Sequence, residues 1–137
     1  MIESIKFGDI FLYKGIYYIF FALQDDLIYA GKILEDKEAE KINNLYQKRI
    51  TQGGRMAEKA EDHILFSYVI LKTEEFKNKM CHFKDAMSGK NSNEEGLFFD
   101  SLAGSLDKDD LIQVKNEIIN GPLPLLLKEL IKTIDIS

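Results

Sequence analysis

The residues from Ile16 to Leu23 form an uninterrupted apolar run, IYYIFFAL, which constrains the fold more than any other part of the chain. The run has eight residues, whereas a membrane-spanning helix needs about 20. Its β-branched and aromatic residues favour a strand over a helix. Because no polar side of the strand remains for solvent, we expect a central strand that is covered on both faces.

The segments on either side of this run predict neighbouring strands. Residues 10–13 are apolar or strand-forming, and Lys14-Gly15 can close a tight hairpin between them and the central strand. Gln24-Asp25-Asp26 predicts a polar turn before a third strand over Leu27–Leu34, in which Gly31 is a candidate bulge. The first third of the chain is therefore expected to form a β-meander.

A helix is predicted over residues 37–50, with Asp36 as its N-cap and Gly53-Gly54 as its end. We expect it to cross the sheet, because its apolar residues recur at the spacing of one helix face. That stripe comprises Ala39, Ile42, Leu45, Tyr46 and Arg49 or Ile50.

The middle of the chain predicts two more strands. Ile64–Leu71 has the composition of a long strand, and Met80–Phe83 that of a short one. Thr73 is expected to cap a single helical turn between them. Residues 84–96 are polar and rich in Gly, Ser and Asn, which is typical of an exposed loop.

The pattern becomes helical beyond that loop. Asp107 can cap a helix that carries Asp109 and Asp110 in its first turn, and Pro124 can open a second helix. The last helix has a wide apolar face, so we expect one side to pack on the sheet and the other to meet a partner or a second copy. The predicted protein interface comprises Leu126, Leu127, Leu130, Ile131 and Ile134.

These elements predict a single α+β domain over residues 1–137. Residues 7–83 would form a strongly bent antiparallel sheet or a small SH3-like barrel with a crossing helix. Residues 84–96 would be a loop, and residues 97–137 a helical C-terminal extension with two helices. A chain of 137 residues has the length of one ordinary domain.

Composition indicates a cytoplasmic protein without a membrane segment. The formal net charge is −5, which argues against a surface devoted to nucleic acid or anionic lipid. Cys81 is the one cysteine, so no intramolecular disulfide can form. The first residues lack the charge and apolar pattern of a signal peptide.

No group of residues has the spacing of a catalytic or metal site. Cys81 and His82 are adjacent, and adjacent side chains of a strand point to opposite faces; the other histidine is His63. Asp107, Asp109 and Asp110 suit a helix N-terminus better than a metal ion. Gly53-Gly54-Arg55 lacks the Lys-Ser/Thr of a nucleotide loop. We expect no catalytic residues, no metal and no cofactor.

One segment is mildly basic. Residues 37–59 carry six basic and three acidic side chains, a net charge of +3. The basic residues near Tyr46 are candidates for weak contacts with a nucleic acid backbone, although a solvated helix face also explains them. They are Lys48, Arg49, Arg55 and Lys59.

Gly8-Asp9-Ile10, followed by a strand, a turn and long apolar strands, resembles the opening of the PemK/MazF-type toxins, with the similarity reaching at most from Phe7 to about Phe83. The resemblance implies an SH3-like barrel. The ribonuclease activity of that family is associated with an Arg-Pro element, which this chain lacks, since its arginines are Arg49 and Arg55 and its prolines are Pro122 and Pro124.

Taken together, these features favour a small non-catalytic binding module that acts through protein contact, as antitoxin-like or immunity-like proteins do, with a protein partner or a homodimer as its assembly. The alternative is a PemK/MazF-like RNA-binding or endoribonuclease barrel protein.

Overall fold

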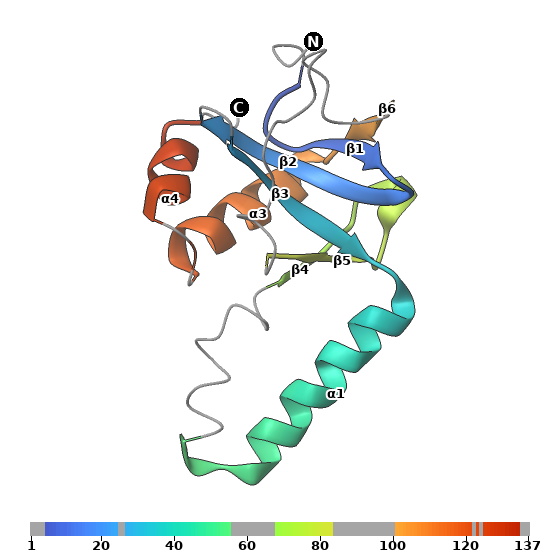
Figure 1. Ribbon diagram of the computed structural model, residues 1–137, viewed down its shortest axis with the longest axis vertical. Coiled ribbons are helices and arrows are strands. Elements are labelled where there is room, and N and C mark those ends of the chain that lie inside the picture. Colours follow the sequence, from blue (N-terminus) through green and yellow to red (C-terminus); the bar gives the residue numbers. More distant parts are fainter. Residues whose placement is uncertain are drawn as a thin grey trace.

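The computed structural model describes residues 5–24, 27–55, 68–83, 101–121, 123 and 125–134. It confirms an α+β fold built on one antiparallel sheet of six strands, in the order β4-β5-β3-β2-β1-β6 (Figure 1). The strands are β1 (Asp9–Tyr13), β2 (Ile16–Gln24), β3 (Leu27–Leu34), β4 (Tyr68–Ile70), β5 (Met80–His82) and β6 (Ser101–Ser105). Within the described residues β4 and β6 form opposite edges, so the sheet is open and no closed barrel is seen.

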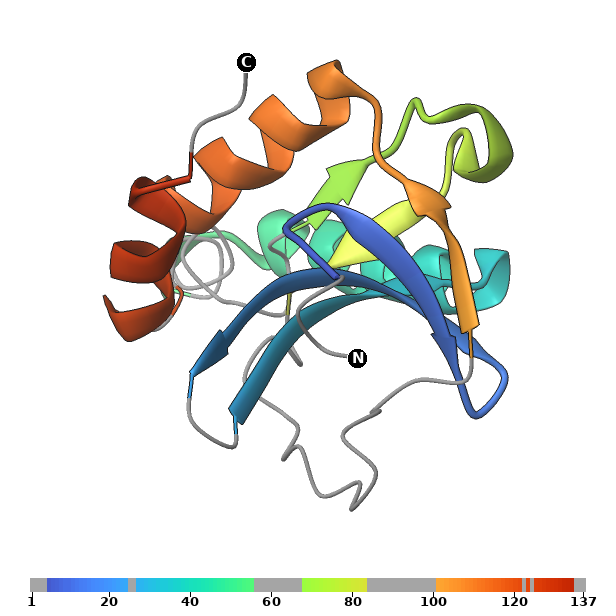
Figure 2. The same ribbon diagram turned by 90° about the horizontal axis from the view of Figure 1, so that it is seen from above.

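The meander forms as predicted. Lys14 and Gly15 both have positive φ, of 51° and 81°, as a two-residue hairpin turn requires. β2 lies between β1 and β3, and the run from Ile16 therefore occupies the middle of the strongly bent sheet (Figure 2). Residues 25 and 26, where a turn was expected, lie outside the described residues.

The predicted bulge at Gly31 is wrong, because the register shift falls in β2, between Phe20 and Ala22. Gly31 has a different role. A Cβ atom at this position would lie 2.7 Å from Cζ of Phe21 and 2.9 Å from Sγ of Cys81. Glycine is therefore required here by close packing against two core side chains.

The two faces of the sheet carry different cores. The larger cluster lies on the face covered by α3 (Lys108–Asn120) and α4 (Leu125–Lys132), where Ile19 and Phe21 of β2 join apolar residues of both helices. A smaller cluster comprises Phe11, Phe20 and Ile28 on the strands and Ile5, which precedes β1. The prediction that the central strand is covered on both faces is confirmed for residues 19–22, whereas Ile16 and Tyr18 are half-buried and Tyr17 is exposed.

The C-terminal region differs from its prediction at one point. Within residues 97–137, which were expected to be a helical extension, Ser101–Ser105 form β6, whose sequence SLAGS has no long apolar pattern to reveal a strand. β6 pairs with β1, and the Oδ1 atom of Asp9 accepts a hydrogen bond of 2.7 Å from the hydroxyl of Ser105. Asp9, part of the Gly-Asp-Ile motif, thus ties the first strand to an edge strand that is distant in sequence.

The helix α1 (Asp36–Gln52) begins one residue earlier than predicted, with Glu35 rather than Asp36 as its N-cap. It does not cross the sheet. It leaves the end of β3 and extends away from the rest of the domain (Figure 1). None of its residues is buried, so the expected packing of its stripe across the sheet is absent.

The remaining predicted elements fall partly on described residues. β4 lies within the strand predicted over Ile64–Leu71, and residues 64–67 lie outside the described part, as does the loop predicted over 84–96. Thr73 is the N-cap of a short 3-10 helix, η3 (Glu74–Phe76), and Met80–Phe83 contains β5.

Candidate functional site

The described residues form a hollow where β3 passes into α1. It has a volume of about 340 Å³. Its walls come from the start of β2, the end of β3, the first turn of α1 and the segment around η3. The lining residues are Ile16, Tyr17, Lys32, Ile33, Leu34, Glu35, Glu38, Glu75, Phe76 and Lys79, and we call this site the base hollow.

The local sequence explains why α1 begins at the base hollow. Glu35 and Glu38 stand at the N-cap and N3 positions and form a capping box, in which the backbone N–H of Glu35 donates to Oε1 of Glu38 at 3.4 Å. Asp36 adds a further carboxylate to the first turn, where the helix dipole favours negative charge. Acidic side chains are thereby concentrated at the foot of the helix.

Two lysines from the sheet region neutralise part of this charge. Nζ of Lys32 lies 2.9 Å from Oε2 of Glu38, and Nζ of Lys79 lies 3.1 Å from Oδ1 of Asp36. The hydrogen bond from Lys32 lowers the pKa of Glu38 below its ordinary value of 4.5. Glu38 is therefore ionised and paired at neutral pH, which makes it a poor general base.

Two carboxylates of the base hollow lack such a counter-charge. No ion pair of the described residues involves Glu35 or Glu75. Beside them the exposed ring of Tyr17 meets the ring of Phe76 edge-on, with the centroids 5.2 Å apart and the planes at 70°. The base hollow therefore combines an aromatic wall with unbalanced negative charge.

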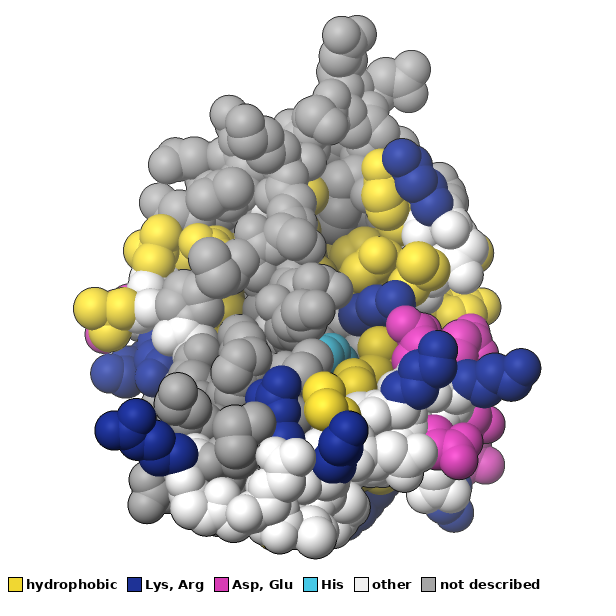
Figure 3. Space-filling view, turned by 60° about the horizontal axis from the view of Figure 1, so that its bottom comes forward, with side chains coloured by type: hydrophobic (Ala, Val, Ile, Leu, Met, Phe, Trp, Pro, Cys, Tyr) yellow, Lys and Arg dark blue, Asp and Glu magenta, His cyan; other side chains and the backbone are white. Residues whose placement is uncertain are grey.

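Figure 3 shows the face of the molecule that includes the outer surface of α1. Most acidic side chains on this face gather on one side, with lysines among them. The sequence of α1 agrees, since Glu40 is its last acidic residue and Lys41, Lys48 and Arg49 follow. The helix is thus acidic at its attached end and basic at its far end.

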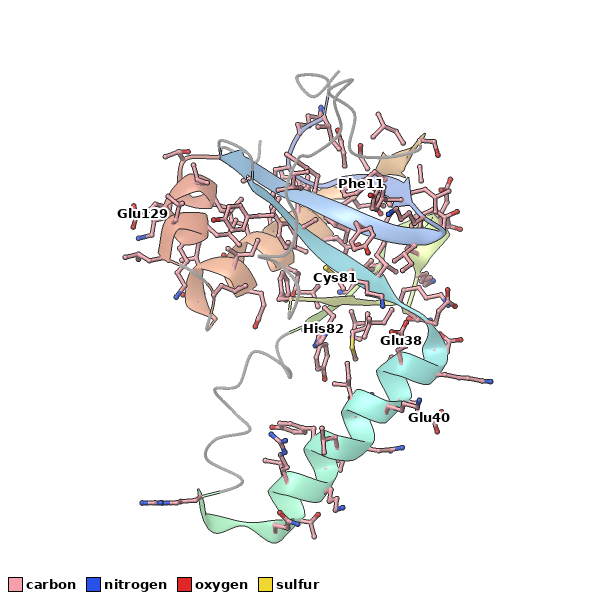
Figure 4. The ribbon with its side chains drawn as sticks, in the orientation of Figure 1. Phe11, Glu38, Glu40, Cys81, His82 and Glu129 are labelled. Carbon is pink, nitrogen blue, oxygen red and sulfur yellow. The ribbon has the colours of Figure 1, made fainter. Side chains whose placement is uncertain are left out.

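Cys81 and His82 do not form a joint site. They point to opposite sides of β5, with Cys81 towards the core and His82 towards the angle between the sheet and α1 (Figure 4). Burial and the charge of Asp110 raise the pKa of the Cys81 thiol far above its usual range, so the thiol is unreactive. His63 lies outside the described residues, among which no three His, Cys, Asp or Glu side chains could hold a metal ion.

The candidate nucleic-acid residues lie along and beyond the second half of α1. Lys48 and Arg55 are exposed, Arg49 is half-buried, and Lys59 lies outside the described residues. None of these side chains lines the base hollow.

The predicted protein interface is divided by the structure. Leu127 and Ile131 are completely buried in the larger core, and Leu130 and Ile134 pack against it. This confirms that one side of the last helix packs on the sheet. Leu126 remains exposed, as does its neighbour Leu125. Contact between this exposed side and a second copy stays a prediction.

Sequence reasoning missed the role of Asp110, a completely buried carboxylate. Its Oδ2 atom accepts hydrogen bonds from the backbone N–H groups of Lys72 and Thr73, at 2.8 and 2.7 Å, and from the hydroxyl of Thr73 at 2.6 Å. Thr73 Oγ1 in turn accepts the backbone N–H of Asp107 at 3.0 Å. Asp110 therefore fastens α3 to the segment before η3. A residue 37 positions away gives no local signal of such a bond.

Comparison with known proteins gives no match: no family model, no curated protein and no solved structure is similar to this chain. No helix in the described part of the chain is long and apolar enough to cross a membrane.

Proposed function

We propose that the protein is a non-catalytic binding module that recognises another protein through α1 and the base hollow. The observation that carries the proposal is the state of α1. A helix of 17 residues, about 25 Å long, contains no buried residue. Among the described elements it packs mainly on β3, close to its own start.

Helices of this kind are rarely stable by themselves. In proteins most of the stability of a helix comes from packing of its apolar face, because short isolated helices are marginal in water. The apolar side of α1 comprises Ala39, Ile42, Leu45, Tyr46 and Ile50, all of them half-exposed, and we call it the α1 stripe. A protein partner would bury the part of the α1 stripe that is still exposed, at Ala39, Ile42, Leu45 and Ile50.

The charges of α1 suit a protein surface of mixed charge. Its far end is basic and its attached end is acidic, so a partner would complement it with acidic groups near Arg49 and basic groups near the base hollow. A long nucleic acid backbone would meet repulsion at the acidic end. This polarity supports protein contact over the RNA-binding alternative.

The base hollow also supports binding over catalysis. Glu38, Lys32, Asp36 and Lys79 are committed to ion pairs, and such mutual neutralisation favours structure rather than proton transfer. An antitoxin-like or immunity-like role is the form of protein binding that we favour.

The test is capture of a partner with matched variants of α1. Leu45→Glu places a charge in the α1 stripe, whereas Gln47→Glu places the same charge on the exposed side of the helix. We expect a protein recovered from an extract of the native host with wild type and Gln47→Glu, and lost with Leu45→Glu while far-UV circular dichroism is unchanged. Recovery that is equal for both variants, or that nuclease treatment abolishes, would contradict the proposal.

A further inference from the structure

The base hollow retains negative charge after its ion pairs are formed. Lys32 is matched by Glu38 and Lys79 by Asp36, which leaves the carboxylates of Glu35 and Glu75. Both residues are exposed at the rim. Negative charge without a counter-ion at the mouth of a hollow attracts a cation, and the paired lysines do not repel it strongly because their own charges are balanced.

The wall of the base hollow suits a flat cation. Tyr17 is 39% exposed, and the edge-on contact with Phe76 holds its ring in place. Glu75 precedes Phe76 in η3 and lines the same hollow as the two aromatic rings. A cation over the face of a tyrosine ring gains about 0.5–1 kcal/mol at exposed sites, and a neighbouring carboxylate adds a charge-assisted hydrogen bond.

We infer that the base hollow binds an arginine side chain of the protein partner, with the guanidinium over the ring of Tyr17 and hydrogen-bonded to Glu75. The inference rests on the proposed function and names the chemistry of the partner at this site. Arginine fits better than lysine, because the planar guanidinium stacks on aromatic rings and pairs with a carboxylate through two N–H groups. The volume of about 340 Å³ lies at the low end for ligand pockets and suits one side chain.

The probe for the test is N-acetyl-arginine amide, titrated into the ¹⁵N-labelled protein and followed by amide chemical shifts. The comparison ligand is N-acetyl-citrulline amide, which has nearly the same shape without the charge. We expect saturable shifts around Tyr17, Glu75 and Phe76 with the arginine probe. We expect binding of the citrulline probe to be about tenfold weaker, since its neutral ureido group keeps N–H donors but lacks the positive charge that would pair with Glu75 and lie over Tyr17.

Matched variants locate the site. Glu75→Gln and Tyr17→Leu should each weaken the arginine probe about three- to fivefold, the loss of one exposed charge or cation–π contact. Glu74→Gln and Tyr13→Leu make the same changes at neighbouring exposed positions and should leave binding unchanged. If Tyr17→Leu unfolds the hairpin, the pair Glu75→Gln and Glu74→Gln decides.

Equal binding of both probes, no saturable shift, or equal effects of Glu75→Gln and Glu74→Gln would overturn the inference. The experiment is independent of the α1 stripe, so Leu45→Glu should bind the arginine probe as wild type does. Failure of the probe with partner capture intact would reject the arginine site alone. Capture that is lost while the probe still binds would reject the role of the α1 stripe alone.

Discussion

The helices α1 and α3 differ in how the same domain holds them. α3 has 13 residues, three of which are buried, Asp110, Val114 and Ile118, and α4 packs beside it with Leu127 and Ile131 in the core. α1 has 17 residues and none buried. The longer helix is therefore the one that packs less against the rest of the domain. The buried side chains hold α3 and α4 in the core of the domain, whereas no side chain of α1 enters that core.

The polar contacts of α3 are also more deeply buried than those of α1. The Asp110 carboxylate of α3 receives hydrogen bonds from two backbone groups and a hydroxyl in a place without solvent. The ion pairs of α1 lie at its first turn and are largely exposed. Exposed pairs contribute about 0–1 kcal/mol each, whereas a buried charge that loses its partners costs several times more.

The largest effect is expected at Leu127. Leu127→Asp should lower the free energy of unfolding by more than about 4 kcal/mol, because it places a charge in the core that α4 shares with the sheet. Leu126→Asp, one position away on the exposed side, should change it by less than about 0.5 kcal/mol. Urea denaturation measures both, and light scattering shows whether Leu126→Asp alters an oligomer. Similar losses for the two variants would contradict the placement of α4.

The anchor of α3 is tested next. Asp110→Ala leaves the N–H groups of Lys72 and Thr73 without an acceptor, so we expect a loss of about 3 kcal/mol in the free energy of unfolding. Asp109→Ala is the control, since Asp109 is exposed in the same helical turn. A loss below about 1 kcal/mol for Asp110→Ala would mean that the buried bonds do not hold α3.

The α1 stripe should show a much smaller effect on the isolated protein. We expect Leu45→Glu to change the free energy of unfolding by less than about 1 kcal/mol, because the side chain is half-exposed and leaves no cavity in a core. Gln47→Glu is again the matched change. A loss from Leu45→Glu as large as that from Asp110→Ala would show that the stripe belongs to the core of the fold.

The smallest effect concerns pH. The pKa of Glu38 is lowered in the folded protein by its hydrogen bond from Lys32, so its contribution is present above its ordinary pKa of 4.5 and is lost as the pH falls through the lower folded value. The Glu38 side chain is 44% exposed, so the contribution is below about 1 kcal/mol. The amide shifts around Lys32 and Glu38 should respond to acid in this range, and Glu38→Gln should reduce the response while Glu40→Gln does not.

Local patterns predicted the first part of the fold well. The apolar run from Ile16 and the Lys14-Gly15 turn carry their information in neighbouring residues, and both formed as expected. β6 escaped prediction because SLAGS has little strand character of its own and depends on pairing with β1. The glycine at position 31 was wrongly interpreted as a bulge, because its actual role depends on packing against Phe21 and Cys81. These two residues belong to other strands and give no local signal.

The candidate site was less predictable than the fold. The stripe of α1 was found by its spacing, but spacing does not tell whether the domain or a partner covers an apolar face. The base hollow joins β2, β3, α1 and η3, and its charge balance depends on Lys79 lying opposite Asp36, 43 positions away. Such pairings follow from the arrangement of the strands and have no local sequence signal.

The central claim, that α1 packs on the described part of the domain mainly near its first turn and offers its far half to a partner, is tested most directly by native-state hydrogen exchange of the isolated protein. We predict that the amides of residues 43–50 exchange roughly 100-fold or more faster than those of Val114 and Ile118, which should open only with global unfolding. Protection of residues 43–50 equal to that of α3 would contradict the claim.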